Sequence, residues 1–293
     1  MSKRPVVLVV MDGVGISDSE FGNAVKKAYK PTLDNLWENS PHTEIKAHGL
    51  AVGLPTDDDM GNSEVGHNAL GCGQIYSQGA KLVNENIETG EIFKTETWSG
   101  LVNNCKDGKM HFLGLLSDGN VHSHINHLKA LIKKAKEDGV KEVRVHALLD
   151  GRDVPETSAL TYVDDIEAYM AELNDDSFHA CIASGGGRMT ITMDRYEANW
   201  AMVEQGWHVH VLGEGREFAS AKEAIETYRA ESGVVDQDLP GFVIAKDGKP
   251  VGTIEMETVS FCSTSVVTVH RKSLWRLTEM TALTSLTVSE CRR

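Results

Sequence analysis

The residues best suited to chemistry in this sequence stand where apolar runs give way to glycine. Asp12 follows the apolar run Val6–Val10 and precedes a glycine, so we expect it at the carboxyl end of a buried strand. An Asp-Gly pair is also a common turn, and that alternative stays open. Ser63 follows the acidic stretch 57–59, where a helix is expected to begin. Its hydroxyl is either a helix N-cap or, beside a metal-bound carboxylate, a nucleophile that accepts a phosphoryl group.

Three histidines, His122, His124 and His127, fall within six residues and open a helix directly after an expected strand. Such a cluster could bind a metal ion. His124 and His127 are three residues apart at the helix start, however, and no carboxylate accompanies them in the sequence. We therefore favour contact with a substrate for His122.

Arginines follow two further expected strands. Arg152 and Asp153 come after the strand 142–149, and Arg188 and Arg195 come after the glycine-rich turn 184–187. The arginine next to a carboxylate suits a ligand with anionic and hydroxyl groups, although a surface ion pair is the alternative. In a chain of net charge −14, arginines gathered at strand ends predict a local cationic pocket for a small phosphorylated acid.

Alternating strands and helices must position these side chains. Apolar runs predict strands over 6–10, 43–47, 110–116, 142–149 and 179–183. Helices are predicted from Pro31, with Leu33 and Leu36 facing inward, and over 80–87, 125–137, 158–173 and 221–230. The alternation is typical of an α/β fold with parallel strands, whose carboxyl ends share one edge of the sheet.

Composition narrows the possible partners. The 293 residues are 41% hydrophobic and 25% charged, which is ordinary for a globular protein. The excess of acidic residues argues against nucleic acid as a partner, and no apolar run is long enough to span a membrane. Five widely spaced cysteines without a CxxC pair fit reduced thiols, so we expect a cytoplasmic protein.

Five motifs, taken together and in order, carry a family resemblance. They are VVMDGVG, MGNSEVGHNALG, LLSDGNVHSHINH, DGRDVPETSA and SGGGRMTITMDRYE, and they lie between Val6 and Glu255. In these motifs the chain resembles cofactor-independent (2,3-bisphosphoglycerate-independent) phosphoglycerate mutase, of the alkaline phosphatase superfamily. The resemblance implies an α/β fold in which a partial alkaline-phosphatase-like segment, residues 1–78, precedes an inserted substrate-binding (transferase) domain, residues 79–255.

The resemblance also implies a site and a reaction. Asp12 would be a metal ligand, and Ser63 would be both a ligand and the nucleophile, at a centre that holds two Mn²⁺ ions in the full-length enzyme. Phosphoglycerate would be bound by His122, Arg152, Asp153, Arg188 and Arg195. Phosphate would pass from 3-phosphoglycerate to Ser63 and return to the 2-hydroxyl, as in glycolysis and gluconeogenesis, without 2,3-bisphosphoglycerate. We expect a monomer.

Residues 256–293 depart from the family pattern. They contain no glycine or aspartate, and they carry 5 basic and 3 acidic residues in an otherwise acidic chain. A one-nucleotide shift of the back-translated tail permits the family's continuation, so we interpret the tail as a frameshift near Glu255. The family's later arginines, lysine and remaining metal ligands, including the second metal site, would then be missing. We therefore expect little mutase activity from this chain. The alternatives are a non-catalytic fragment that binds phosphorylated acids and a metal-dependent phosphatase of the same superfamily.

Overall fold

The computed structural model describes residues 5–11, 14–61, 63–77, 79–193, 199–255 and 259–262. The chain divides into two compact units, Met1–Ile45 and Lys46–Arg293. The larger of these units contains residues 46–77 together with the sheet. Asp12 and Arg195 lie outside the described residues, as does the tail except for 259–262.

The described residues of the smaller unit form the helices α1 (Ala24–Lys27) and α2 (Pro31–Asn39). The predicted start at Pro31 is confirmed, and the proline occupies the first turn, where its missing N–H costs nothing. The expectation that Leu33 and Leu36 face inward was wrong, because both stay well exposed. They line an open cavity of about 520 Å³, whose other lining residues include Met11, Trp37 and His42.

The expected strand Val6–Val10 is absent from the structure, and this prediction was wrong. The segment has no strand assignment, and its side chains are exposed, up to 96% for Val6. A buried parallel strand requires hydrogen-bonded neighbours, and no described residue pairs with this run. The segment 43–47, also predicted as a strand, is irregular for the same reason.

The larger unit begins with short helices that precede its sheet. They are η1 (Gly49–Val52), α3 (Ser63–Cys72), α4 (Gly79–Glu88), η2 (Glu91–Lys94) and α5 (Glu96–Asn104). The predicted helix start at Ser63 is confirmed. Thr95 caps α5 by accepting a hydrogen bond from the backbone N–H of Trp98 at 3.2 Å.

A sheet in the strand order β4-β5-β3-β2-β1-β7 forms the centre of this unit. Its first half alternates β1 (Lys109–Leu116), α6 (Ile125–Glu137), β2 (Glu142–Leu149), α7 (Ala159–Leu173) and β3 (His179–Gly187). Strands β1, β2 and β3 are parallel, and β7 (Val259–Cys262) runs parallel to β1. The predicted α/β class with a parallel sheet is confirmed.

The second half of the sheet follows α8 (Trp200–Trp207) and the π-helix η3 (His208–Leu212). It comprises β4 (Arg216–Phe218), α9 (Ala221–Ser232), η4 (Asp236–Asp238), β5 (Phe242–Lys246) and β6 (Lys249–Pro250). Strands β4 and β5 are parallel to each other, but β5 runs antiparallel to β3. No helix among the described residues is both long and apolar enough to cross a membrane.

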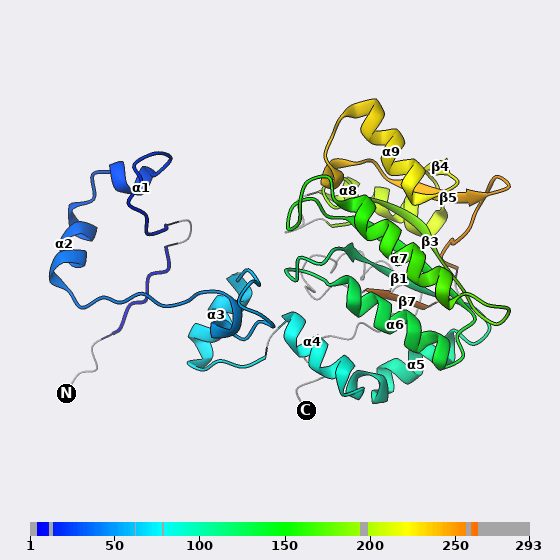
Figure 1. The fold of residues 1–293 in the computed structure, drawn as a ribbon, viewed down its shortest axis with the longest axis horizontal. Coiled ribbons are helices and arrows are strands. Elements are labelled where there is room, and N and C mark those ends of the chain that lie inside the picture. Colours follow the sequence, from blue (N-terminus) through cyan, green and yellow to red (C-terminus); the bar gives the residue numbers. More distant parts are fainter. Residues whose placement is uncertain are drawn as a thin grey trace. The chain divides into compact units, whose positions relative to one another are not determined.

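Apolar side chains cover both faces of the sheet. On one face, Met110 and Phe112 of β1 pack with the apolar stripe of α6, including Leu131 and Ile132. Figure 1 shows α6 and α7 lying along the strands. On the other face, Leu113 and the neighbouring strand residues pack against residues from the segment after β3. This double coverage explains why every residue of β1 and β2 after the first is buried.

The glycine-rich segment Ser184–Gly187, predicted as a turn, belongs instead to β3. A Cβ atom on Gly185 would lie 2.5 Å from Cζ of Phe242 and 2.6 Å from the carbonyl oxygen of Ala147. One on Gly187 would lie 2.2 Å from the carbonyl oxygen of Gln237. The glycines therefore allow close packing within the sheet, a tertiary requirement that resembles a turn signal in the sequence.

Candidate functional site

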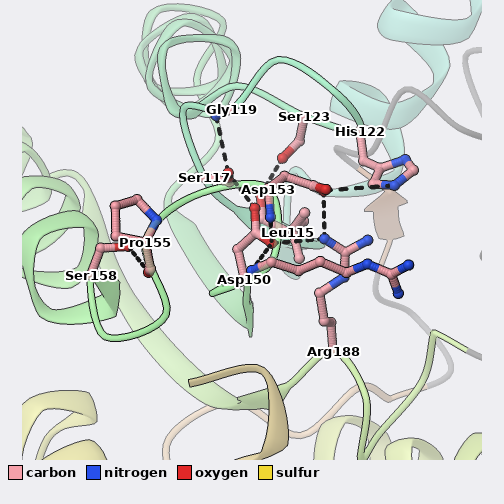
Figure 2. Close-up of polar contacts among 11 residues, drawn as sticks. Leu115, Ser117, Gly119, His122, Ser123, Asp150, Asp153, Pro155, Ser158 and Arg188 are labelled. Carbon is pink, nitrogen blue, oxygen red and sulfur yellow. Dashed lines mark hydrogen bonds and ion pairs between the residues drawn. The ribbon is translucent and has the colours of Figure 1, made fainter. Parts of the chain in front are cut away.

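The carboxyl ends of β1, β2 and β3 bring polar residues from three loops together (Figure 2). Ser117 follows β1, Asp150 and Asp153 follow β2, and Arg188 follows β3. Parallel pairing in register aligns these ends, because Leu116 lies opposite Leu149 and Leu149 opposite Gly187. The sequence-based expectation that these loops meet at one edge is confirmed by this geometry.

Arg188 is the best-buried cation of the site. Its side chain is 7% exposed, and Nη1 donates to Oδ1 of Asp150 at 2.7 Å and to Oδ2 of Asp153 at 2.6 Å. Two carboxylates thus hold one end of the guanidinium. Among the described residues, its Nε and Nη2 groups make no hydrogen bond, so this edge is left to bind a carboxylate or phosphate side-on.

His122 lies beside the same carboxylate. Its Nε2 is 3.8 Å from Oδ2 of Asp153, and both side chains are mostly buried. Arg152 lies one residue before Asp153 but is exposed, and within the described residues its guanidinium forms no ion pair. The strand-end cluster therefore combines a fixed arginine, an exposed arginine and a histidine, which can neutralise the charges of a small anion.

The loop after β1 is shaped by its own polar contacts. The backbone N–H of Gly119 donates to Oγ of Ser117 at 3.1 Å, and Asn120 adopts a left-handed conformation with φ of 57°. A Cβ atom on Gly119 would lie 3.0 Å from the carbonyl oxygen of Asp153, so only glycine fits easily here. Asp118 accepts a hydrogen bond from Tyr162 at 2.6 Å. Burial and this bond raise the pKa of Tyr162 to about 12.

The remaining histidines of the cluster have structural contacts. His124 caps α6, with Nδ1 accepting from the backbone N–H of Asn126 at 3.1 Å. His127 is buried, and its Nε2 lies 2.5 Å from Oδ1 of Asn84. Burial lowers the pKa of His127 to about 4. His124 and His127 thus use these ring nitrogens for contacts within the protein.

Ser63 makes no contact with the residues of the strand-end cluster among the hydrogen bonds and ion pairs of the described residues. It is exposed at the first position of α3, and its carbonyl oxygen lies 2.6 Å from Nδ1 of His67. No hydrogen bond or ion pair in the described part of the chain joins Ser63 to His122, Arg152 or Arg188. The structure thus brings together His122, Asp153 and Arg188, with Arg152 adjacent.

A metal centre requires several oxygen or nitrogen ligands around one point. Among the described residues, no group of three or more His, Cys, Asp or Glu side chains is arranged to hold an ion. Asp12, the other ligand that the resemblance implies, lies outside them. The described residues by themselves therefore do not form the two-ion centre that the resemblance implies.

Two residues at the centre of the site, Ser117 and Asp150, were not predicted. Asp150 accepts hydrogen bonds from Ser117 Oγ at 2.6 Å and from Arg188, and it anchors the turn that carries Arg152 and Asp153. The only sequence signal was their position, directly after the apolar runs of β1 and β2. Position alone does not identify a hydrogen-bond partner that lies 33 residues away.

Comparisons with a family model, with protein sequences and with solved structures all match this chain to proteins of the same kind. A family model described as "BPG-independent PGAM N-terminus" matches residues 83–263. The chain is 56% identical over 257 residues to the Leptospira interrogans protein named "Probable 2,3-bisphosphoglycerate-independent phosphoglycerate mutase", a match covering 86% of this chain and 47% of that protein. It is 50% identical over 267 residues to the Trypanosoma brucei brucei protein named "2,3-bisphosphoglycerate-independent phosphoglycerate mutase", covering 89% and 48%.

A solved structure shows the same similarity in three dimensions. It is a Leishmania mexicana phosphoglycerate mutase crystallised at low cobalt concentration, with a TM-score of 0.80 and 48% sequence identity. The match covers 87% of this chain and 47% of that one. The chain thus spans about half the length of the curated relatives it matches.

Proposed function

Because the chain belongs to the BPG-independent phosphoglycerate mutase family, we propose that its strand-end pocket binds phosphoglycerate for interconversion of the 3- and 2-phospho isomers. The observation that carries this proposal is Arg188, fixed by two carboxylates with one edge left for a ligand. Phosphoglycerate offers a phosphate, a carboxylate and a hydroxyl group. An arginine fork, a second cation and a nearby carboxylate provide one partner for each.

Each pocket residue has a part in this proposal. Arg188 would bind one anionic group side-on, and exposed Arg152 would close over the other as a mobile cation. Asp153 has an oxygen that Arg188 does not engage, and it would accept a hydrogen bond from the hydroxyl. His122 would donate to the phosphate. We propose the same substrate contact for Arg195, which lies outside the described residues.

In the full-length relatives' reaction, we propose that Ser63 accepts the phosphoryl group and returns it to the other hydroxyl of glycerate. The position of Ser63 at the start of α3 supports this role, since free backbone N–H groups there favour an anion on the serine oxygen. A divalent metal, which we infer to be Mn²⁺ with Asp12 and Ser63 among its ligands, would supply charge neutralisation when bound.

The arrangement of this chain in a longer parent is also a proposal. Residues 1–78 would complete a phosphatase domain, and 79–255 would form the inserted domain that grips the substrate. We propose a monomer that acts in glycolysis in the cytoplasm. The 293-residue chain alone would bind phosphoglycerate with little or no turnover.

Calorimetry with 3-phosphoglycerate tests binding directly. Arg188→Ala should weaken binding on the order of 10- to 100-fold, because hydrogen bonds to charged groups contribute about 1.5–3 kcal/mol. Arg188→Lys retains the charge but loses the fork, so its loss should be intermediate. The control is Arg216→Ala, which removes an exposed arginine of β4 that forms an ion pair with Glu231. Equal affinity for wild type and Arg188→Ala would contradict the proposed pocket.

An assay with 3-phosphoglycerate and Mn²⁺ separates the functions that remain. Binding without turnover identifies a binding fragment. Phosphate release without 2-phosphoglycerate identifies a phosphatase. Turnover near that of a full-length relative would contradict our expectation of low activity.

A further inference from the structure

We propose that Asp150 is a positioning residue, which aims the guanidinium of Arg188 at the ligand. The inference rests on the proposed function of the site. It states that the orientation of the Arg188 guanidinium is set by a residue that need not contact the ligand. Figure 2 shows Asp150 between the loops that follow the three strands.

The contacts of Asp150 reach all three strand ends. Its side chain is 1% exposed. Oδ2 accepts from Ser117 Oγ at 2.6 Å, after β1. Oδ1 accepts from Nη1 of Arg188 at 2.7 Å, after β3, and from the backbone N–H groups of Arg152 at 3.2 Å and Asp153 at 3.1 Å. Both oxygens are therefore engaged by the protein, which leaves Asp150 poorly placed to bind a ligand itself.

Charge explains why a carboxylate occupies this position. A second negative charge near an anion site repels the ligand. Asp150 therefore weakens binding unless it also stabilises a group that binds the ligand. Together with Asp153, it provides a buried counter-charge that offsets the desolvation of the Arg188 guanidinium, whose side chain is 7% exposed. Because Asp150 and Asp153 both bind Nη1, the Nε–Nη2 edge is the part of the guanidinium left for the anion.

A purely local role for Asp150 is the competing explanation. An aspartate that accepts from N–H groups two and three residues later forms a common turn, and the contact with Arg188 could be incidental. The two roles make different predictions. A turn former acts on Arg152 and Asp153 whether or not Arg188 is present, whereas a positioning residue for Arg188 has no effect on affinity once Arg188 is removed.

The variant Asp150→Asn separates charge from shape. The amide oxygen can still accept from the two backbone N–H groups, and Ser117 can accept from the amide nitrogen, so the turn is retained while the charge that holds Arg188 is lost. We expect the affinity for 3-phosphoglycerate to fall about 10-fold or more. The control Asp138→Asn makes the same change at the far end of α6, where Asp138 accepts from Trp98 Nε1 at 2.7 Å, and should leave the affinity unchanged.

A double-mutant cycle decides between the two roles. If Asp150 acts through Arg188, adding Asp150→Asn to Arg188→Ala should cause no further loss of affinity. Equal losses in the wild-type and Arg188→Ala backgrounds would overturn the proposal. Thermal unfolding of each variant confirms that it is folded, and Ser117→Ala provides a milder perturbation of the same carboxylate if Asp150→Asn does not fold.

A ligand-free measurement keeps this inference separate from the proposed function. In protein labelled with ¹⁵N-arginine, the side-chain N–H signals of Arg188, assigned by their loss in Arg188→Lys, should exchange slowly in the wild type and fast in Asp150→Asn. If the wild type does not bind 3-phosphoglycerate, the proposed function fails, and the NMR comparison alone decides the role of Asp150. Unchanged exchange in Asp150→Asn would overturn the positioning role whatever the binding result.

Discussion

At the scale of single residues, a chain of buried hydrogen bonds crosses the sheet. Nδ1 of His111 lies 2.8 Å from Nε2 of His146, whose Nδ1 lies 2.6 Å from Oγ of Ser184. That hydroxyl lies 2.7 Å from Nδ1 of His210. Burial, assisted by the charge of Arg144, lowers the pKa of His111 to about 3 and that of His146 well below its ordinary value. The rings of His111 and His146 are therefore neutral in the folded protein at physiological pH.

We predict that acid destabilises the protein through these neutral histidines. In the unfolded chain, histidine takes up a proton near pH 6.5, but folded His111 does so only near pH 3. Below pH 6.5 the unfolded state thus binds more protons than the folded state. The free energy of unfolding therefore decreases as the pH is lowered. Each such histidine contributes about 1.4 kcal/mol per pH unit until its folded pKa is reached. Urea unfolding between about pH 7.5 and 4.5 measures this slope.

A single variant tests the attribution to histidine. His127, with its pKa lowered to about 4, pairs with Asn84, and glutamine can retain a hydrogen bond to that amide. His127→Gln should reduce the slope between pH 6.5 and 4 by about 1.4 kcal/mol per pH unit. Exposed His48→Gln is the control. An identical slope in wild type and His127→Gln would contradict the assignment.

At the scale of elements, the packing of β3 depends on its glycines. Gly185→Ala would place Cβ 2.6 Å from the carbonyl oxygen of Ala147 in the adjacent strand, and that backbone oxygen cannot move without disturbing the sheet. We expect a loss of about 1–3 kcal/mol in the free energy of unfolding, as for overpacked cores. Gly100→Ala in α5, where nothing lies within 4 Å, should instead stabilise by up to about 1 kcal/mol. Denaturant titration of both variants checks these opposite signs.

The elements also show what the sequence can and cannot predict. Strands β1 and β2 were predictable because their apolar runs ended in the polar, glycine-containing sequences Ser117-Asp118-Gly119 and Asp150-Gly151, and parallel strands bring those ends to one edge. Asp150 was missed because its partners Ser117 and Arg188 lie 33 and 38 residues away. The run Val6–Val10 has a strand pattern, but no pattern in a segment specifies whether a neighbouring strand exists to pair with it. Likewise, a glycine-rich segment has the same appearance in the sequence whether a turn or a crowded strand requires its glycines.

At the scale of the whole molecule, one contact ties the segment before Ser63 to the loop after β1. Nδ2 of Asn120 donates to Oδ1 of Asp59 at 2.6 Å, and Oδ2 of Asp59 accepts from the hydroxyl of Thr56 at 2.8 Å. Asp59 is buried. Residues 61 positions apart in sequence are thus joined through a buried carboxylate, and both of its oxygens accept hydrogen bonds, as expected for a buried polar group.

We predict that Asn120→Asp loosens this segment, because it sets a second carboxylate against Asp59 in place of a donor. Hydrogen exchange of the backbone over 49–72 should become faster, while exchange in β1–β3 stays slow. Asn103→Asp adds the same charge at an exposed position on α5 and serves as the control. Unchanged exchange over 49–72 in Asn120→Asp would show that this contact does not hold the segment.

The exposed run Val6–Val10 has a consequence for the protein in solution. Its consecutive aliphatic side chains, which no strand among the described residues covers, can add to the same segment of another molecule, as exposed strand edges do. The net charge of −14 opposes that encounter by mutual repulsion. This repulsion acts over a distance that shrinks from about 30 Å at about 0.01 M salt to about 10 Å at about 0.1 M.

Added salt should therefore increase light scattering by concentrated protein. Leu8→Lys places a charge in the middle of the run and should suppress the increase, whereas Lys27→Arg, which keeps the charge outside the run, should not. Equal scattering by wild type and Leu8→Lys at every salt concentration would exclude this segment as the cause. The colloidal behaviour of this chain is thus set by a competition between one self-associating segment and the charge of the rest.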